Sequence, residues 1–150
     1  PGDDASSQVR KSAKSAKSNQ KSPGALGASS STLKKKFGEA IMGDGFTGIP
    51  NLFLKHLKDL NLSHLDSLLV IHLFSFWWGP ADAIWPSKAT LAARLNATES
   101  TVRRRVVRME DMGYIKRVFR KGKEGGNMTN VYDLSGLIAK LNELALKAAA

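Results

Sequence analysis

The stretch that decides the predicted fold is SKATLAARLNATESTVRRRVVRMEDMG, residues 87–113. Ser87 and Thr98 are typical helix N-cap residues, and each precedes a run with helical periodicity. Asn96 and Ala97 allow only a tight turn between the two runs, and Gly113 stands where a left-handed residue closes a helix. The sequence therefore predicts two helices joined by a tight turn, the second of them over residues 99–112.

This second helix has one apolar side and one basic side. At about 100° per residue, Val102, Val106 and Met109 lie within about 60° of one another and mark the buried side. Arg103 and Arg105 lie on the two flanks. The residues that point away from the core are Ser100, Arg104, Val107, Arg108 and Asp111, with Thr101 beside them.

Helices and a hairpin are expected around this pair. Residues 46–60 predict an extended entry and then a helix from about Asn51, and Ser63 is expected to cap a central helix, with Asp66 at its N3 position, that runs to about Trp78. Residues 114–134 predict two strands around a glycine-rich loop. Ser135 is expected to cap a last helix, 136–147, whose apolar stripe is Leu137, Ile138, Leu141, Leu144 and Leu146.

The predicted fold class is mainly α with a small β-hairpin, in the order of a winged helix-turn-helix. Residues 37–147 are expected to form this domain. Residues 1–36, rich in Ser, Lys, Ala and Gly, have little to bury and predict a disordered basic tail, and residues 148–150 a disordered end.

Positive charge is concentrated in the middle of the chain. The 150 residues carry a net charge of +10. Between Ser87 and Lys123, 11 basic residues face only three acidic ones, which gives +8. Such localised charge indicates a polyanionic partner, either nucleic acid or an anionic membrane surface.

Other functional classes have weak support. The chain has no cysteine, and the apolar stretch 68–78 is shorter than the roughly 20 residues of a membrane span. No signal peptide is evident, so we expect a cytoplasmic bacterial protein without a membrane partner. The glycine-rich stretch 122–126 lacks the ending of a phosphate loop, and no catalytic triad or carboxylate pair has supporting context.

We therefore expect no enzyme activity, no cofactor, no metal and no small-molecule ligand. The three histidines lie on different predicted surfaces, which argues against a metal site: His56, His64 and His72. The three tryptophans offer either a ligand pocket or core packing under the first helix, and core packing is favoured: Trp77, Trp78 and Trp85.

Residues 46–141 resemble the winged helix-turn-helix family of plasmid and phage replication initiators and proteobacterial regulators. The matching segments are 46–51, 76–78, 85–87 with 90–92, 98–104, 109–115 and 130–135. They include Trp85-Pro86-Ser87, Thr98-Glu99-Ser100-Thr101-Val102-Arg103-Arg104 and Asn130-Val131-Tyr132-Asp133. The resemblance covers about two-thirds of the chain and implies binding of double-stranded DNA, with helix 99–112 in the major groove.

Candidate DNA contacts follow from this geometry. The base-reading set is Ser100, Thr101, Arg104 and Arg108, because arginine contacts guanine edges in two places. The phosphate set is Ser87, Lys88, Thr98, Arg103 and Arg105. The wing set, for the backbone or minor groove, is Arg117, Arg120, Lys121 and Lys123. The tail set, for nonspecific contact, is Lys11, Lys14, Lys17, Lys21, Lys34, Lys35 and Lys36.

The biological role stays open at this stage. A sequence-specific transcriptional regulator is the first hypothesis, and a replication initiator or other DNA-processing accessory is the second. A protein-interaction winged helix is the alternative of a different class. A homodimer through the C-terminal helix is expected, unless that helix packs on its own domain.

Overall fold

The structure, a computed structural model, describes residues 29–119 and 131–150. The chain divides into two compact units, residues 1–46 and 47–150, which are described separately. The first unit contains α2 (Ser30–Phe37) and α3 (Glu39–Met42). Predictions for residues 1–28 and 120–130 lie outside the described residues.

Residues 30–36 form a helix, where the sequence predicted disorder. The Ser29 hydroxyl accepts a hydrogen bond from the Thr32 amide at 3.2 Å, which caps α2. Its last turn contains Lys34, Lys35 and Lys36, whose positive charges interact favourably with the negative end of the helix dipole. No residue of α2 or α3 is buried, so these local effects, rather than a core, account for the helix.

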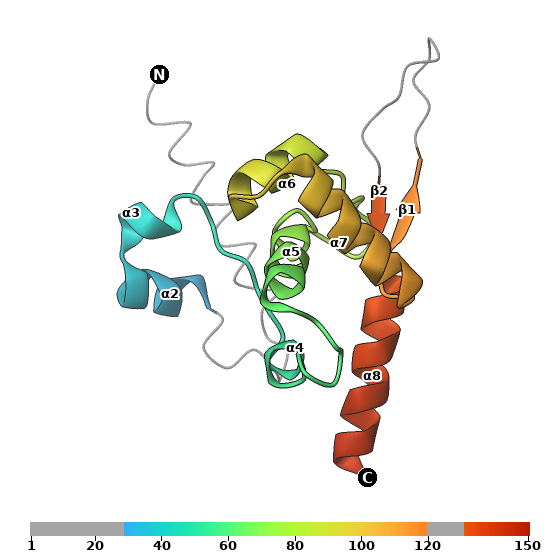
Figure 1. The fold of residues 1–150 in the computed structure, drawn as a ribbon. Helices are drawn as coiled ribbons and strands as arrows, with labels where there is room; N and C mark the ends of the chain where they lie inside the picture. Colours follow the sequence, from blue (N-terminus) through green and yellow to red (C-terminus); the bar gives the residue numbers. More distant parts are fainter. Residues whose placement is uncertain (1–28, 120–130) are drawn as a thin grey trace. The chain divides into compact units, whose positions relative to one another are not determined.

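The second unit is mainly helical with one small antiparallel sheet (Figure 1). Its elements are α4 (Asn51–Lys55), α5 (His64–Ser75), α6 (Lys88–Leu95), α7 (Glu99–Asp111), β1 (Lys116–Val118), β2 (Val131–Asp133) and α8 (Ser135–Ala149). The α4 helix is shorter than predicted, because residues 56–61 continue as turns. None of the helices in the described ranges is long and apolar enough to cross a membrane.

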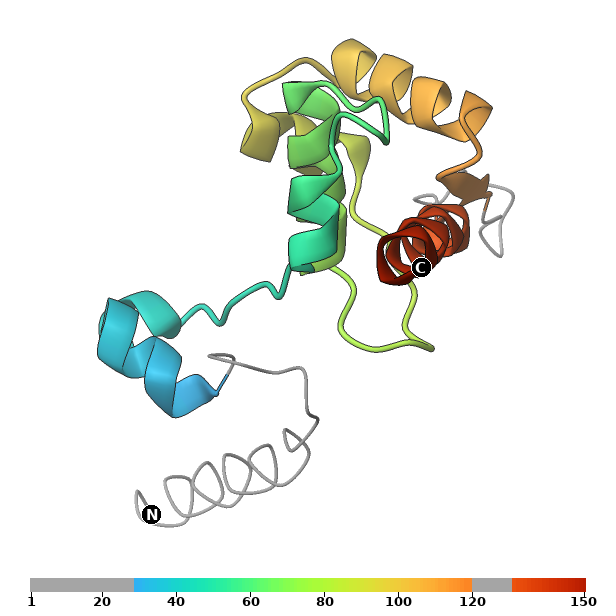
Figure 2. The ribbon, with the colours of Figure 1, turned by 90° about the horizontal axis from the view of Figure 1, so that it is seen from below.

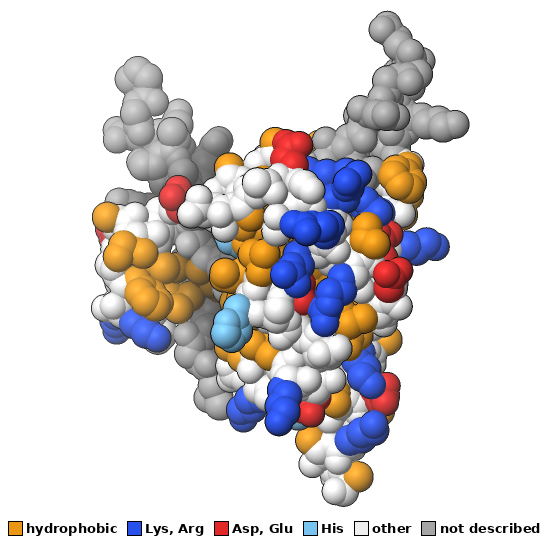
Figure 3. Space-filling view, in the orientation of Figure 1, with side chains coloured by type: hydrophobic (Ala, Val, Ile, Leu, Met, Phe, Trp, Pro, Cys, Tyr) orange, Lys and Arg blue, Asp and Glu red, His pale blue; other side chains and the backbone are white. Residues whose placement is uncertain are grey.

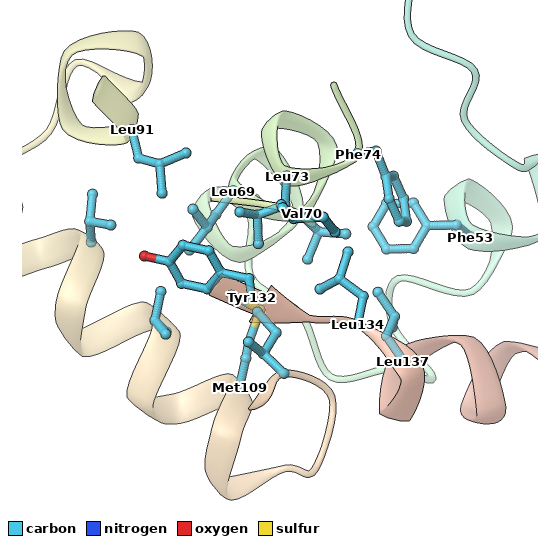
Figure 4. Close-up of a cluster of buried hydrophobic side chains, with 14 of the residues drawn as sticks. Phe53, Leu69, Val70, Leu73, Phe74, Leu91, Met109, Tyr132, Leu134 and Leu137 are labelled. Atoms are coloured by element: carbon cyan, nitrogen blue, oxygen red, sulfur yellow. The ribbon is translucent and has the colours of Figure 1, made fainter. Parts of the chain in front are cut away.

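The core gathers around α5, as predicted for the central helix. Leu69, Val70 and Leu73 of this helix have no exposed surface. Side chains from the surrounding elements converge on them: Phe53 from α4, Leu91 from α6, Met109 from α7, Tyr132 from β2 and Leu137 from α8 (Figure 4). The Phe53 and Phe74 rings pack edge to face with their centroids 5.6 Å apart.

The sheet is attached to the core through β2. Its register pairs Lys116 with Asp133 and Val118 with Val131. The Tyr132 amide donates to the Ile84 carbonyl at 2.7 Å, so the segment before α6 lines the outer side of β2. Burial raises the pKa of the Tyr132 hydroxyl; the nearby Arg117 lowers it and Glu110 raises it further.

The start of α8 is capped differently from the prediction. Ser135 is the first helical residue, and the Asp133 carboxylate accepts its amide hydrogen at 2.8 Å. Hydrogen bonds from the backbone and the side chain of Ser135 lower the pKa of the Asp133 carboxyl. The capping role therefore moves two residues toward the N-terminus, since Asp133 is the acidic residue within reach of the free amides.

The apolar stripe of α8 packs on its own domain. Leu137 and Leu141 are buried, and Ile138 and Leu144 pack against the core. Only Leu146 of the predicted stripe is mainly exposed, at 73%. The alternative in which this helix closes its own core is confirmed.

In Figure 2, which views α8 nearly end-on, the chain that leaves α7 passes beside α8, and close backbone contact joins the two segments. A Cβ atom on Gly136 would lie 1.8 Å from the Gly113 carbonyl oxygen, and the Leu137 amide donates to the Tyr114 carbonyl at 3.1 Å. Gly113 closes α7 with φ +80°, as the sequence predicted.

Two of the three tryptophans are not in the core, contrary to the prediction. The α5 helix ends at Ser75, three residues earlier than expected, and Trp78 is 86% exposed. Trp85 is 55% exposed, while Trp77 packs against the core. Trp77 also lines an apolar hollow of about 580 Å³ between the 80–84 segment, β2 and α8.

Candidate nucleic-acid interface

The helix pair α6–α7 forms as its local sequence requires. The Ser87 hydroxyl caps α6 by accepting the Thr90 amide at 3.0 Å, and the Thr98 hydroxyl caps α7 by accepting the Thr101 amide at 3.1 Å. Asn96 takes the left-handed conformation, with φ +49°, and makes the tight turn. Two members of the phosphate set, Ser87 and Thr98, thus already use their hydroxyl oxygens within the protein.

The predicted sides of α7 are confirmed by burial. Val102, Val106 and Met109 are at most 1% exposed. Ser100, Arg103 and Arg104 are exposed, and the Arg104 guanidinium donates to the Thr101 hydroxyl at 3.2 Å. Lys and Arg side chains gather along α7 on the face seen in Figure 3. Arg103 and Arg104 therefore project from the outer side of α7.

Arg108, predicted to read bases, is engaged within the protein. Its Nη1 donates to Asp66 Oδ2 at 2.5 Å and its Nη2 donates to the Asn61 carbonyl at 2.9 Å. The side chain bends from α7 toward the N-terminus of α5, because a buried carboxylate there requires a cationic partner. Arg108 is therefore held against its own domain, whereas the helical angles placed it on the outer side of α7.

Asp66 is the buried charge that sequence reasoning did not connect to α7. Its side chain has no exposed surface. Its Oδ2 accepts the Ser63 amide at 3.0 Å, and its own amide donates to the Ser63 hydroxyl at 3.1 Å, which forms a capping box. Arg105 Nη1 lies 3.7 Å from Asp66 Oδ1, so Arg105 also faces this carboxylate.

The corner between α4 and α5 is held by side chains from the C-terminal half of α7 and the residues after it. The Tyr114 hydroxyl donates to the Leu60 carbonyl at 2.9 Å, beside the bond from Arg108 to Asn61. Asn61 adopts φ +56°, the left-handed conformation that a tight corner uses. Hydrogen bonds from Arg108 and Tyr114 therefore connect α7 and the residues after it to this corner.

The described part of the predicted wing has fewer unpaired positive charges than expected. Arg117 Nη2 lies 2.7 Å from Glu110 Oε1, and its side chain is 15% exposed. Arg117 therefore ties β1 to α7. Lys116 is exposed on the same strand. The other wing residues, Arg120, Lys121 and Lys123, lie outside the described residues, as do Lys11, Lys14, Lys17 and Lys21 of the tail set.

The histidines do not come together. Among the described residues, no group of three or more His, Asp or Glu side chains could hold a metal ion. His56 pairs with Asp59 at 2.7 Å. Burial, and then the Arg94 guanidinium, lower the pKa of His72.

The described fold and surface define a small, mainly helical domain with a two-stranded sheet and a cationic helix. Residues 49–150, more than half of the chain, match the DnaD N-terminal domain family. The chain belongs to that family. None of the curated proteins compared with the chain matches it.

Two solved structures are similar to this chain. The crystal structure of the N-terminal domain of DnaD protein from Geobacillus kaustophilus HTA426 has 28% sequence identity and a TM-score of 0.55, and covers 77% of this chain and 94% of its own. A possible transcriptional regulator from Methanosarcina mazei Go1 has 21% identity and a TM-score of 0.43, and covers 62% of this chain and 75% of its own.

Proposed function

We propose that this chain is a DNA-associated protein of bacterial replication, acting in the cytoplasm, and that the exposed side of α7 binds duplex DNA. The observation that carries the proposal is the pair of exposed arginines on α7, Arg103 and Arg104, opposite its buried side. Membership in the DnaD N-terminal domain family, a family associated with replication, favours this role over the transcriptional regulator that the sequence put first. The proposed activity is binding, without catalysis or a cofactor.

Within this proposal, α6, the turn and α7 act as a helix-turn-helix, and β1 and β2 act as its wing. An α-helix fits the major groove of duplex DNA. Arg104 and Ser100 would face base edges, and Arg103 would contact a phosphate on one wall of the groove. Because Arg105 and Arg108 face Asp66, neither is assigned a contact to base edges or to the groove walls.

Fluorescence anisotropy of the full chain with labelled duplexes tests the interface. Arg104→Gln is expected to weaken binding to a selected duplex by about 1–3 kcal/mol and binding to random duplexes much less. Arg103→Gln should weaken both alike and reduce the salt slope by about 0.9. Lys147→Gln, which removes the same charge at the far end of α8, is the matched control.

The outcomes separate the hypotheses. Equal losses on selected and random duplexes for Arg104→Gln would make it a phosphate contact. Unchanged binding in both arginine variants would refute the α7 interface. If the full chain binds no duplex at low salt, the protein-interaction hypothesis takes its place, with Trp78 as an exposed candidate contact.

The predicted homodimer through α8 has lost most of its support. Because the stripe packs on its own core, Leu146 is the main apolar side chain that this helix leaves for a partner. Light scattering at increasing protein concentration tests the point, and a constant monomer mass would exclude this dimer.

A further inference from the structure

Three guanidinium groups of α7 converge on one place. Arg104, Arg105 and Arg108 line a hollow of about 190 Å³ on the surface of the second unit. The residues are spaced so that Arg104 and Arg108 are one helical turn apart and Arg105 lies beside them. All three residues that line the hollow belong to α7, along which Lys and Arg side chains gather in Figure 3.

Two of these guanidinium groups are held by a buried carboxylate of α5. Asp66, fully buried, pairs with Arg108 at 2.5 Å and faces Arg105 at 3.7 Å. Asp66 Oδ1 has no hydrogen-bond partner among the described residues, so it can still attract the Arg105 guanidinium electrostatically. The carboxylate therefore restrains both side chains and reduces the entropy that a ligand would otherwise have to remove.

The charge of the hollow suits an oxyanion. Three guanidinium charges against the single Asp66 carboxylate leave a local charge of +2. A guanidinium has five N–H donors. Arg108 uses two groups, toward Asp66 and Asn61, and Arg104 uses one, toward Thr101. Several donors remain, and forked donors match the oxygens of phosphate.

We propose that this hollow is a seat for a phosphate group and that it prefers a dianionic phosphate monoester to a phosphodiester. The preference follows from the local charge of +2, which a dianion neutralises and a monoanion does not. The inference deepens the proposed function, and rests on it only where the phosphate is the end of a DNA strand. A free phosphate or nucleotide is the other source of the same chemistry.

Inorganic phosphate is the direct probe. Isothermal titration of the full chain, at constant ionic strength with chloride as the reference, is expected to show phosphate binding. Thermal unfolding under the same conditions is expected to show a higher melting temperature with phosphate than with chloride. Arg105→Gln should weaken phosphate affinity at least about tenfold, because it removes charge-assisted hydrogen bonds. This variant leaves Arg104 in place and breaks only the longer contact with Asp66, so it should fold.

Lys147→Gln is the matched control, since it removes a positive charge at the far end of α8, outside the hollow. Unchanged phosphate affinity in this variant supports the seat. Equal losses in Lys147→Gln and Arg105→Gln, or no phosphate binding by the wild type, would overturn it.

Short duplexes with and without a 5′-phosphate identify the source. Tighter binding of the phosphorylated duplex, lost in Arg105→Gln, supports a strand end. If inorganic phosphate binds but the 5′-phosphate has no effect, the seat stands and its source is a free phosphate. If inorganic phosphate binds and no duplex does, the seat stands and the proposed DNA interface fails. Equal affinity for inorganic phosphate and dimethyl phosphate would overturn the preference for a monoester.

Discussion

Replacing Asp66 tests how the arginine surface is held. The Asp66 side chain caps α5 through Ser63 and pairs with Arg108 and Arg105. Asp66→Ala removes all three interactions. Asp66→Asn keeps an oxygen for the cap and removes the charge, so the pair of variants separates the capping role from the ion pair.

The structure sets the size of each effect. Loss of the hydrogen bond from the Ser63 amide to the Asp66 carboxylate costs about 1 kcal/mol of unfolding free energy, while the bond from the Asp66 amide to the Ser63 hydroxyl remains. The Arg108 bond is charge-assisted, but because that side chain is 36% exposed, solvent screening reduces its contribution to about 1 kcal/mol. The Arg105 contact adds a few tenths at most. We expect Asp66→Ala to lose about 2 kcal/mol and Asp66→Asn about 1 kcal/mol.

Urea unfolding measures both losses, and a double-mutant cycle isolates the ion pair. Combining Asp66→Asn with Arg108→Gln should give a coupling energy of about 1 kcal/mol. Additive losses, with coupling below about 0.3 kcal/mol, would refute the ion pair as a stabilising contact. Equal losses for the Asn and Ala variants would refute the capping role.

Two further stability predictions concern other parts of the second unit. Gly136→Ala should destabilise the domain by at least about 1–3 kcal/mol in urea unfolding, because its Cβ would clash with the Gly113 carbonyl. Gly48→Ala, with nothing within 4 Å of the added atom, should cost little by comparison, and similar losses would contradict the close approach. Since burial and Arg94 lower the folded-state pKa of His72, the unfolded chain binds its proton more readily. Stability should therefore be greatest above about pH 6.5 and decrease as the pH falls through the lowered pKa, and His72→Gln should flatten that decrease.

Local signals in the sequence predicted the α6–α7 pair well. Thr98 as N-cap, Gly113 as closing residue and the buried side of Val102, Val106 and Met109 depend on neighbours within a few residues. Chain-local hydrogen bonds and helical periodicity determine all of them, so the pattern along the chain is enough.

The direction of Arg108 depends on a residue 42 positions away in the sequence. Helical angles place its Cβ on the outer side of α7, but a long side chain can reach a partner beside the helix. The sequence did contain a signal for this contact, because Asp66 is an acidic residue in the first turn of a helix that is apolar on nearly all sides. A carboxylate in such a helix is buried and requires a cation, although the sequence does not say which one.

The exposed Trp78 has a different cause. The prediction extended α5 through the apolar run to the Gly79-Pro80 break, but the helix ends at Ser75, whose hydroxyl donates to the His72 carbonyl at 2.6 Å. Residues beyond that point leave the helix axis, and their apolar character no longer implies burial. Periodicity identifies a helix better than its last turn.

Hydrogen exchange near the corner at residues 60–61 can report whether a ligand is bound to α7. Its two carbonyls are bonded by Tyr114 and Arg108 rather than by neighbours in its own segment. Any ligand that draws the Arg108 guanidinium away from Asn61 therefore frees one side of that corner and leaves the Tyr114 bond intact. Amide hydrogen exchange around residues 61–63 should then change when the arginine surface is occupied, so the state of α7 can be followed without a label on any residue that touches the ligand.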